Sequence, residues 1–154
     1  MATEEQLMQQ RMLVEEVGRY FDQEGHQPIA GRILGLLLVM DKELYTFDEI
    51  IEELKISKSS ASIVLRNLQI RGSIEYITLP GDRKRYYRFK TIDPITLLNE
   101  FERKLIILKE MSETIGRLKS NPESRNTVFL REMCQMSDFF LSRMNHIKEQ
   151  YKNQ

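Results

Sequence analysis

A dense cluster of basic side chains surrounds one tight turn near the middle of the sequence. The stretch TLPGDRKRYYRF, residues 78–89, carries four basic and three aromatic residues around a Pro-Gly-Asp turn. The segregation of charge extends further, because residues 55–90 hold nine bases and two acids, whereas residues 41–54 hold one base and six acids. The chain as a whole is neutral. A local excess of this size is typical of a surface that binds a polyanion, although a charge run can also be no more than a solvated face.

No group of residues has the spacing of a catalytic or metal site. The sequence shows no glycine-rich phosphate loop, no paired histidines and no arrangement of nucleophile and base, so we expect neither an enzyme nor a cofactor. His26 and His146 have no cluster of metal-ligand types beside them, and no metal is expected. Cys134 is the single cysteine; we expect a packing thiol, and a redox-sensing thiol is the alternative.

Length and composition predict a soluble cytoplasmic protein. The 154 residues suffice for one domain with additional helices. One cysteine cannot form an intrachain disulfide, which fits a reducing compartment. The polar start MATEEQLMQQR does not resemble a signal peptide. The longest apolar run, residues 33–40, is far shorter than the roughly 20 residues that span a bilayer, so no membrane partner is expected.

Hydrophobic periodicity predicts the elements that position the basic cluster. Helices are expected over residues 4–24, 29–40 and 47–54, the last opened by a capping box of Thr46 and Glu49. Gly31 and Gly35 of the second helix predict close approach of a neighbouring helix. A fourth helix is expected to begin after Ser57 as N-cap and to run to Arg71, with Gly72 terminating it.

The pattern then changes to the alternation of a β-hairpin. Residues 73–79 and 84–89 are rich in β-formers and are separated by Pro80, Gly81 and Asp82, which are expected to shape the turn. One face of the return strand is basic, so the hairpin is predicted to dock its apolar face and leave its basic face free.

Two long amphipathic helices are predicted after residue 93. Their apolar stripes extend over residues 97–118 and 129–151, which is more than a small domain can cover alone. The same surface on a second copy of the chain is the simplest cover, so a homodimer is expected.

The order of elements from residue 29 onward predicts a winged helix-turn-helix. The fold class is therefore mainly α with a small β-hairpin wing (α+β), flanked by long N- and C-terminal dimerisation helices. Its fourth helix can lie in the major groove of double-stranded DNA, and the hairpin tip can reach the adjacent backbone or minor groove. The candidate recognition-helix residues are Ser57, Lys58, Ser59, Ser60, Ser62, Ile63, Arg66 and Asn67, and the candidate wing residues are Arg83, Lys84, Arg85 and Arg88.

Residues 31–89, GRILGLLLVMDKELYTFDEIIEELKISKSSASIVLRNLQIRGSIEYITLPGDRKRYYRF, resemble the DNA-binding domain of the MarR superfamily, and most of all its GbsR-type branch. The resemblance implies a sequence-specific transcriptional regulator, expected to be a repressor, that binds a pseudo-palindromic operator as a dimer. It implies that Asp82 holds the wing geometry and that Arg83 is the foremost DNA contact. The expected organisation is an N-terminal dimerisation helix (1–27), a DNA-binding domain (28–92) and a C-terminal dimerisation region (93–154).

Two questions stay open at this level. A winged-helix module that binds proteins and not DNA is the alternative function, and it requires an apolar exposed face on the fourth helix. A small-molecule effector of unknown identity is compatible with the resemblance, since GbsR-type relatives are associated with choline-like ligands. Such a cation needs an aromatic cage, for which Tyr20, Phe21, Tyr45 and Phe101 are the candidates.

Overall fold

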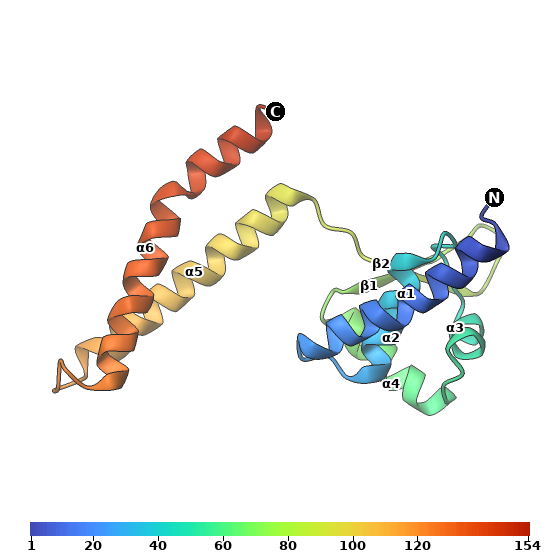
Figure 1. The fold of residues 1–154 in the computed structure, drawn as a ribbon, viewed down its shortest axis with the longest axis horizontal. Coiled ribbons are helices and arrows are strands. Elements are labelled where there is room, and N and C mark those ends of the chain that lie inside the picture. The colour runs from blue at the N-terminus through green and yellow to red at the C-terminus, as the bar shows by residue number, and fades with distance from the viewer. The chain divides into compact units, whose positions relative to one another are not determined.

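The computed structural model describes residues 1–154 and divides them into two compact units, residues 1–91 and 92–154. The elements of the first unit are α1 (Glu4–Gln23), α2 (Pro28–Val39), α3 (Phe47–Leu54), α4 (Lys58–Ile70), β1 (Ile74–Thr78) and β2 (Arg85–Phe89), and those of the second are α5 (Pro94–Arg117) and α6 (Arg125–Lys152) (Figure 1). This mainly helical fold with one antiparallel hairpin confirms the predicted fold class. None of the helices has the length and apolar character needed to cross a membrane.

Helices α1 and α2 lie against each other at glycine positions. A Cβ atom on Gly35 would stand 2.6 Å from the carbonyl oxygen of Val14, and one on Gly31 would meet the carbonyl oxygen of Gly18. Only a residue without a side chain allows backbones to approach so closely, which confirms the expectation for Gly31 and Gly35. The segment expected as a separate N-terminal helix (1–27) is therefore part of the same compact unit as residues 28–91, and its role in dimerisation remains a proposal.

The core of the first unit forms around α2. Ile33, Leu34 and Leu36 are almost completely buried, and they share one apolar cluster with residues of α3, α4 and the hairpin. Tyr45, which precedes α3, joins this core through two backbone hydrogen bonds with Tyr87 of β2. The hairpin is thereby attached to the helices along one face.

The connection between α3 and α4 has the geometry of a helix-turn-helix. Thr46 caps α3 in a capping box with Glu49, as expected. The turn is made by Lys55, whose backbone adopts the left-handed conformation with φ of 54°, a conformation that costs a residue with a side chain roughly 1–2 kcal/mol. Ser57 then caps α4 by accepting a hydrogen bond from the backbone N–H of Ser60.

In the second unit, α5 and α6 form an antiparallel hairpin of helices (Figure 1). Leu105 and Ser112 of α5 are buried against α6, as are Ser137 and Met144 of α6 against α5. The small side chains of the two serines let the helices lie close together.

Candidate nucleic-acid interface

Helix α4 has one buried face and one exposed face. Ala61, Val64, Leu65 and Leu68 are buried in the core, as the sequence predicted. At about 3.6 residues per turn, the side chains opposite this face are those of Ser59, Ile63, Arg66 and Ile70, and all four are exposed.

The remaining candidate residues of α4 lie at its N-terminus or on its flanks. Ser57 and Lys58 are exposed at the start of the helix, whose first turn contains no acidic residue to repel phosphate. Ser62 is exposed on one flank, and Ser60 is half-buried on the other. Asn67 also lies on that second flank, where it lines a small cavity of about 70 Å³ with His26 and Gln27. Arg66 thus faces outward more directly than Asn67.

The wing turns through a tight loop of four residues. The backbone N–H of Asp82 donates to the carbonyl of Leu79 at 3.0 Å, with Pro80 and Gly81 between them. Gly81 has φ of 77°, which is the requirement of the third position in a type II turn. The proline and the glycine therefore stand where their backbone preferences are needed.

Asp82 ties this turn to the return strand. One carboxylate oxygen accepts the backbone N–H of Lys84 at 2.9 Å, and the other accepts the hydroxyl of Tyr86 at 2.5 Å. The hydrogen bond from Tyr86, and to a lesser degree that from Lys84, holds the pKa of Asp82 below its usual value of 3.8. The bond between Asp82 and Tyr86 also raises the pKa of Tyr86. Because the carboxyl pKa is lowered, the contribution of the carboxylate to loop order is present above its ordinary pKa and is lost as the pH falls through the lowered value. The Tyr86 partner was not foreseen from the sequence, although its alternation with Tyr87 places it on the basic face.

Most basic groups of residues 55–90 have no acidic partner. Of the nine, only Arg88 lies within 4.0 Å of a carboxylate, that of Glu75 directly across the hairpin at 3.4 Å. By contrast, three of the four bases of the preceding helices and loops, Arg11, Arg32 and Lys42, are in ion pairs, and only Arg19 is not. Within residues 1–91, the unpaired positive charge is therefore concentrated on α4, the wing and the residues that connect them, whereas the ten bases of residues 92–154 are nearly balanced by nine acids.

The basic residues of the wing fall into two groups. The side chains of Arg83 and Lys84 are exposed at the tip and make no hydrogen bond or ion pair within the chain. The guanidinium of Arg85 lies over the ring of Tyr76 at 4.6 Å, and Arg88 is paired with Glu75. The tip residues are the freer pair, while Arg85 and Arg88 are oriented by neighbours that only the strand register reveals.

Removing the carboxylate of Asp82 should loosen the wing without unfolding the protein. We expect Asp82→Ala to weaken DNA binding roughly five-fold on every sequence, since the lost hydrogen bonds are local, and Tyr86→Phe to have a smaller effect in the same direction. Fluorescence anisotropy gives the affinities, and amide hydrogen exchange at residues 82–86 reports the loop. A variant that exchanges faster yet binds DNA like the parent would show that wing order does not matter.

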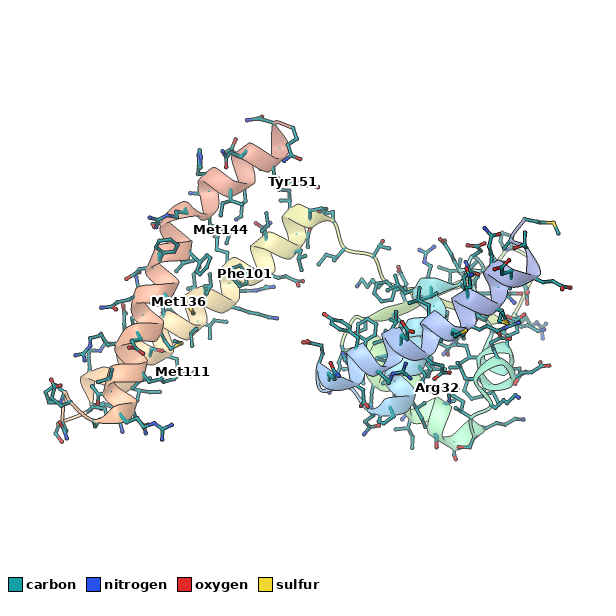
Figure 2. All side chains as sticks on the ribbon, in the orientation of Figure 1. Arg32, Phe101, Met111, Met136, Met144 and Tyr151 are labelled. Atoms are coloured by element: carbon teal, nitrogen blue, oxygen red, sulfur yellow. The ribbon has the colours of Figure 1, made fainter.

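The helical hairpin of the second unit has one charged side and one apolar side. Ion pairs join Lys109 to Asp138 and Lys148 to Glu102 across the charged side. On the other side, helical spacing aligns exposed apolar residues of both helices. The ring of Phe101 of α5 packs edge to face against that of Phe140 of α6 there, with ring centroids 6.1 Å apart. This apolar flank consists of Leu97, Phe101, Met111 and Ile115 of α5 and Phe129, Met136, Phe140, Ile147 and Tyr151 of α6 (Figure 2 labels Phe101, Met111, Met136 and Tyr151).

The candidate aromatic cage is not assembled within either unit. Tyr20 and Phe21 are neighbours on α1, with ring centroids 5.5 Å apart. Tyr45 is buried in the core with the Lys42 ammonium 4.7 Å above its ring, and Phe101 belongs to the other unit. Cys134 is half-buried, its thiol donates to the carbonyl of Lys109, and burial raises its pKa, which disfavours the thiolate.

Comparison with known proteins decides the family. No family model matches the chain. The HTH-type transcriptional regulator MmpR5 of Mycobacterium tuberculosis (strain ATCC 25618 / H37Rv) is 31% identical over 120 residues, which make up 78% of this chain and 73% of that protein. The chain belongs to the MarR-like HTH-type transcriptional regulators.

One solved structure agrees with this assignment. A crystal structure of a transcriptional regulator covers 95% of this regulator and is itself covered over 99% of its length, with a TM-score of 0.68 and 26% identity. A crystal structure of MepR, a transcription regulator of the Staphylococcus aureus multidrug efflux pump MepA, has 22% identity and a TM-score of 0.43 over 88% of this chain and 96% of that one. The relatives are transcriptional regulators and not enzymes, which supports the prediction that this chain is a DNA-binding transcriptional regulator.

Proposed function

We propose that this regulator acts as a homodimeric repressor on a pseudo-palindromic operator, with α4 of each protomer in a major groove and each wing on the adjacent backbone or minor groove. The observation that carries the proposal is the excess of nine bases over two acids in residues 55–90, of which only Arg88 is paired, in a segment that includes the exposed face of α4 and the tip of the wing. Two such half-sites would lie about one helical turn apart. Membership of the GbsR-type branch and a cytoplasmic location complete the proposal, and both are supported by sequence features alone.

The apolar flank of the α5–α6 hairpin supports the homodimer. Its nine residues extend along both helices, and contiguous exposed apolar surface of this kind marks association sites in soluble proteins. A second copy supplies the same surface and closes the interface by two-fold symmetry. A response to a small-molecule effector is also part of the proposal, although no residues are assigned to it.

A mobility-shift series against the upstream region of its own gene tests DNA binding. We expect a discrete complex of two protomers per duplex, and competition by unrelated duplex only at large excess. Absence of any shifted species at low salt, with protein shown to be folded, would contradict the proposal.

The alternative, a winged-helix module that binds proteins, is favoured by one observation. Ile63 and Ile70 are 61% and 77% exposed on α4, which supplies the apolar face that this alternative requires. Retention of the protein on immobilised duplex DNA at low salt distinguishes the two, because only the DNA-binding function predicts it.

Substitutions on the wing and on α4 should have different consequences. Arg83→Ala removes a phosphate contact, so we expect weaker binding to all sequences. The slope of the logarithm of affinity against the logarithm of salt concentration should become shallower by about one for each wing. Arg66→Ala removes a base-reading side chain, so we expect relaxed specificity at one position per half-site, worth about 1–3 kcal/mol; Asn67→Ala should act similarly. Affinities for the operator and for single-base variants measure both effects. Equal losses of specificity from Arg83 and Arg66 would refute the assigned roles.

A further inference from the structure

The exposed face of α4 is not uniformly polar. Its centre contains Ser59, Ile63, Arg66 and Ile70, and the two isoleucines are 61% and 77% exposed. Neither belongs to the apolar cluster of the first unit. Single exposed apolar side chains are common on proteins, so the position of each isoleucine on the helix must decide what it does.

The two isoleucines differ in their distance from the start of the helix. Ile63 lies in the second turn of α4, four residues after Ser59 and three before Arg66, whereas Ile70 is the last residue of the helix. In helix-turn-helix proteins the N-terminal part of the recognition helix contacts the base edges. Ile63 is therefore placed among the groups that would face the bases, and Ile70 beyond them.

The major groove offers one apolar group to such a side chain. Each base pair presents hydrogen-bond donors and acceptors there, and thymine adds its C5-methyl group. An isoleucine can bond to none of the polar atoms, and it would cover them at a cost. Contact with the methyl group is the favourable alternative, because both surfaces leave water together.

We propose that Ile63 recognises the C5-methyl group of a thymine in each operator half-site, next to the base read by Arg66. This inference rests on the proposed binding of DNA by α4 and adds to it the chemical identity of one recognised base. Ile70 takes no part in base recognition.

Replacement of thymine by deoxyuridine tests the proposal, because it removes the methyl group and keeps every hydrogen-bonding atom. The operator is first selected from random duplexes with the full-length protein, and each thymine is then replaced in turn and symmetrically in both half-sites. Burial of one methylene-sized group is worth about four-fold in an equilibrium constant. We expect one thymine per half-site whose replacement weakens binding about four-fold, or about fifteen-fold for both.

Two variants assign the effect to a side chain. Ile63→Ala should bind the thymine operator more weakly and show no further loss with deoxyuridine, whereas Ile70→Ala should keep the full loss. Both residues are exposed, so neither change should unfold the protein, and circular dichroism checks this. The proposal is overturned if no thymine shows the loss, if Ile63→Ala retains it, or if Ile70→Ala abolishes it. Selection that recovers no duplex would instead refute DNA binding itself.

Discussion

Operator affinity is expected to fall by roughly 10³–10⁵-fold between 50 and 200 mM salt, if the dimer neutralises about six to ten phosphates. The expectation follows from the unpaired bases of residues 55–90, of which only Arg88 has a carboxylate partner. Each phosphate contact releases counterions, so the logarithm of the affinity falls linearly with that of the salt concentration. Anisotropy titrations at five or six salt concentrations measure the slope.

A matched arginine outside the proposed interface provides the control. Arg125, at the start of α6, is exposed and has no ion pair. Arg125→Ala should leave the slope unchanged, whereas Arg83→Ala should reduce it by about one for each wing. An operator affinity that is insensitive to salt, or a slope that changes equally in both variants, would show that the basic wing is not the DNA contact.

A charge on the apolar flank of the helical hairpin should separate the dimer. Met111 is 52% exposed on this flank, in the part of α5 nearer the loop to α6 (Figure 2), and Met111→Glu would bury a carboxylate in the proposed interface, where it has no partner. A monomer binds one half-site only. A dimer that engages both half-sites can bind with an affinity roughly 10²–10⁴-fold higher than that of a single site. We therefore expect a monomer by light scattering and a loss of operator affinity of roughly 10²–10⁴-fold.

The same substitution on the charged side of the hairpin separates this effect from general damage. Ile106 is 40% exposed and lies five residues before Met111, which places it more than a third of a turn away on α5. Ile106→Glu should remain dimeric and bind the operator normally. If Met111→Glu stays a dimer at micromolar concentration, the apolar flank is not the homodimer interface.

Local signals were sufficient to predict the elements of the first unit. The capping box at Thr46, the N-cap at Ser57 and the turn at Pro80 and Gly81 each depend on residues that are neighbours in sequence. Backbone preferences and side-chain caps act over three or four residues, so their consequences can be read without the fold. The buried stripe of α4 follows from periodicity for the same reason.

Contacts between distant residues could not be predicted in this way. The pairing of Arg88 with Glu75 depends on strand register, and the orientation of Arg85 depends on Tyr76 of the opposite strand. The sequence likewise left open which helix packs against α2; in the structure the backbone of α1 lies there, at Gly31 and Gly35. Those glycines indicated a close neighbour but not which helix it was.

The sequence by itself determined that this protein has a winged helix-turn-helix with a concentrated positive charge, because element type and local charge depend on composition and spacing. Only the tertiary structure decided which of those charges remain unpaired, and that Asn67 lies beside a small cavity with His26 and Gln27. Whether a basic side chain is free to bind DNA depends on which other side chains lie within a few ångströms of it. That is set by packing between segments far apart in the chain.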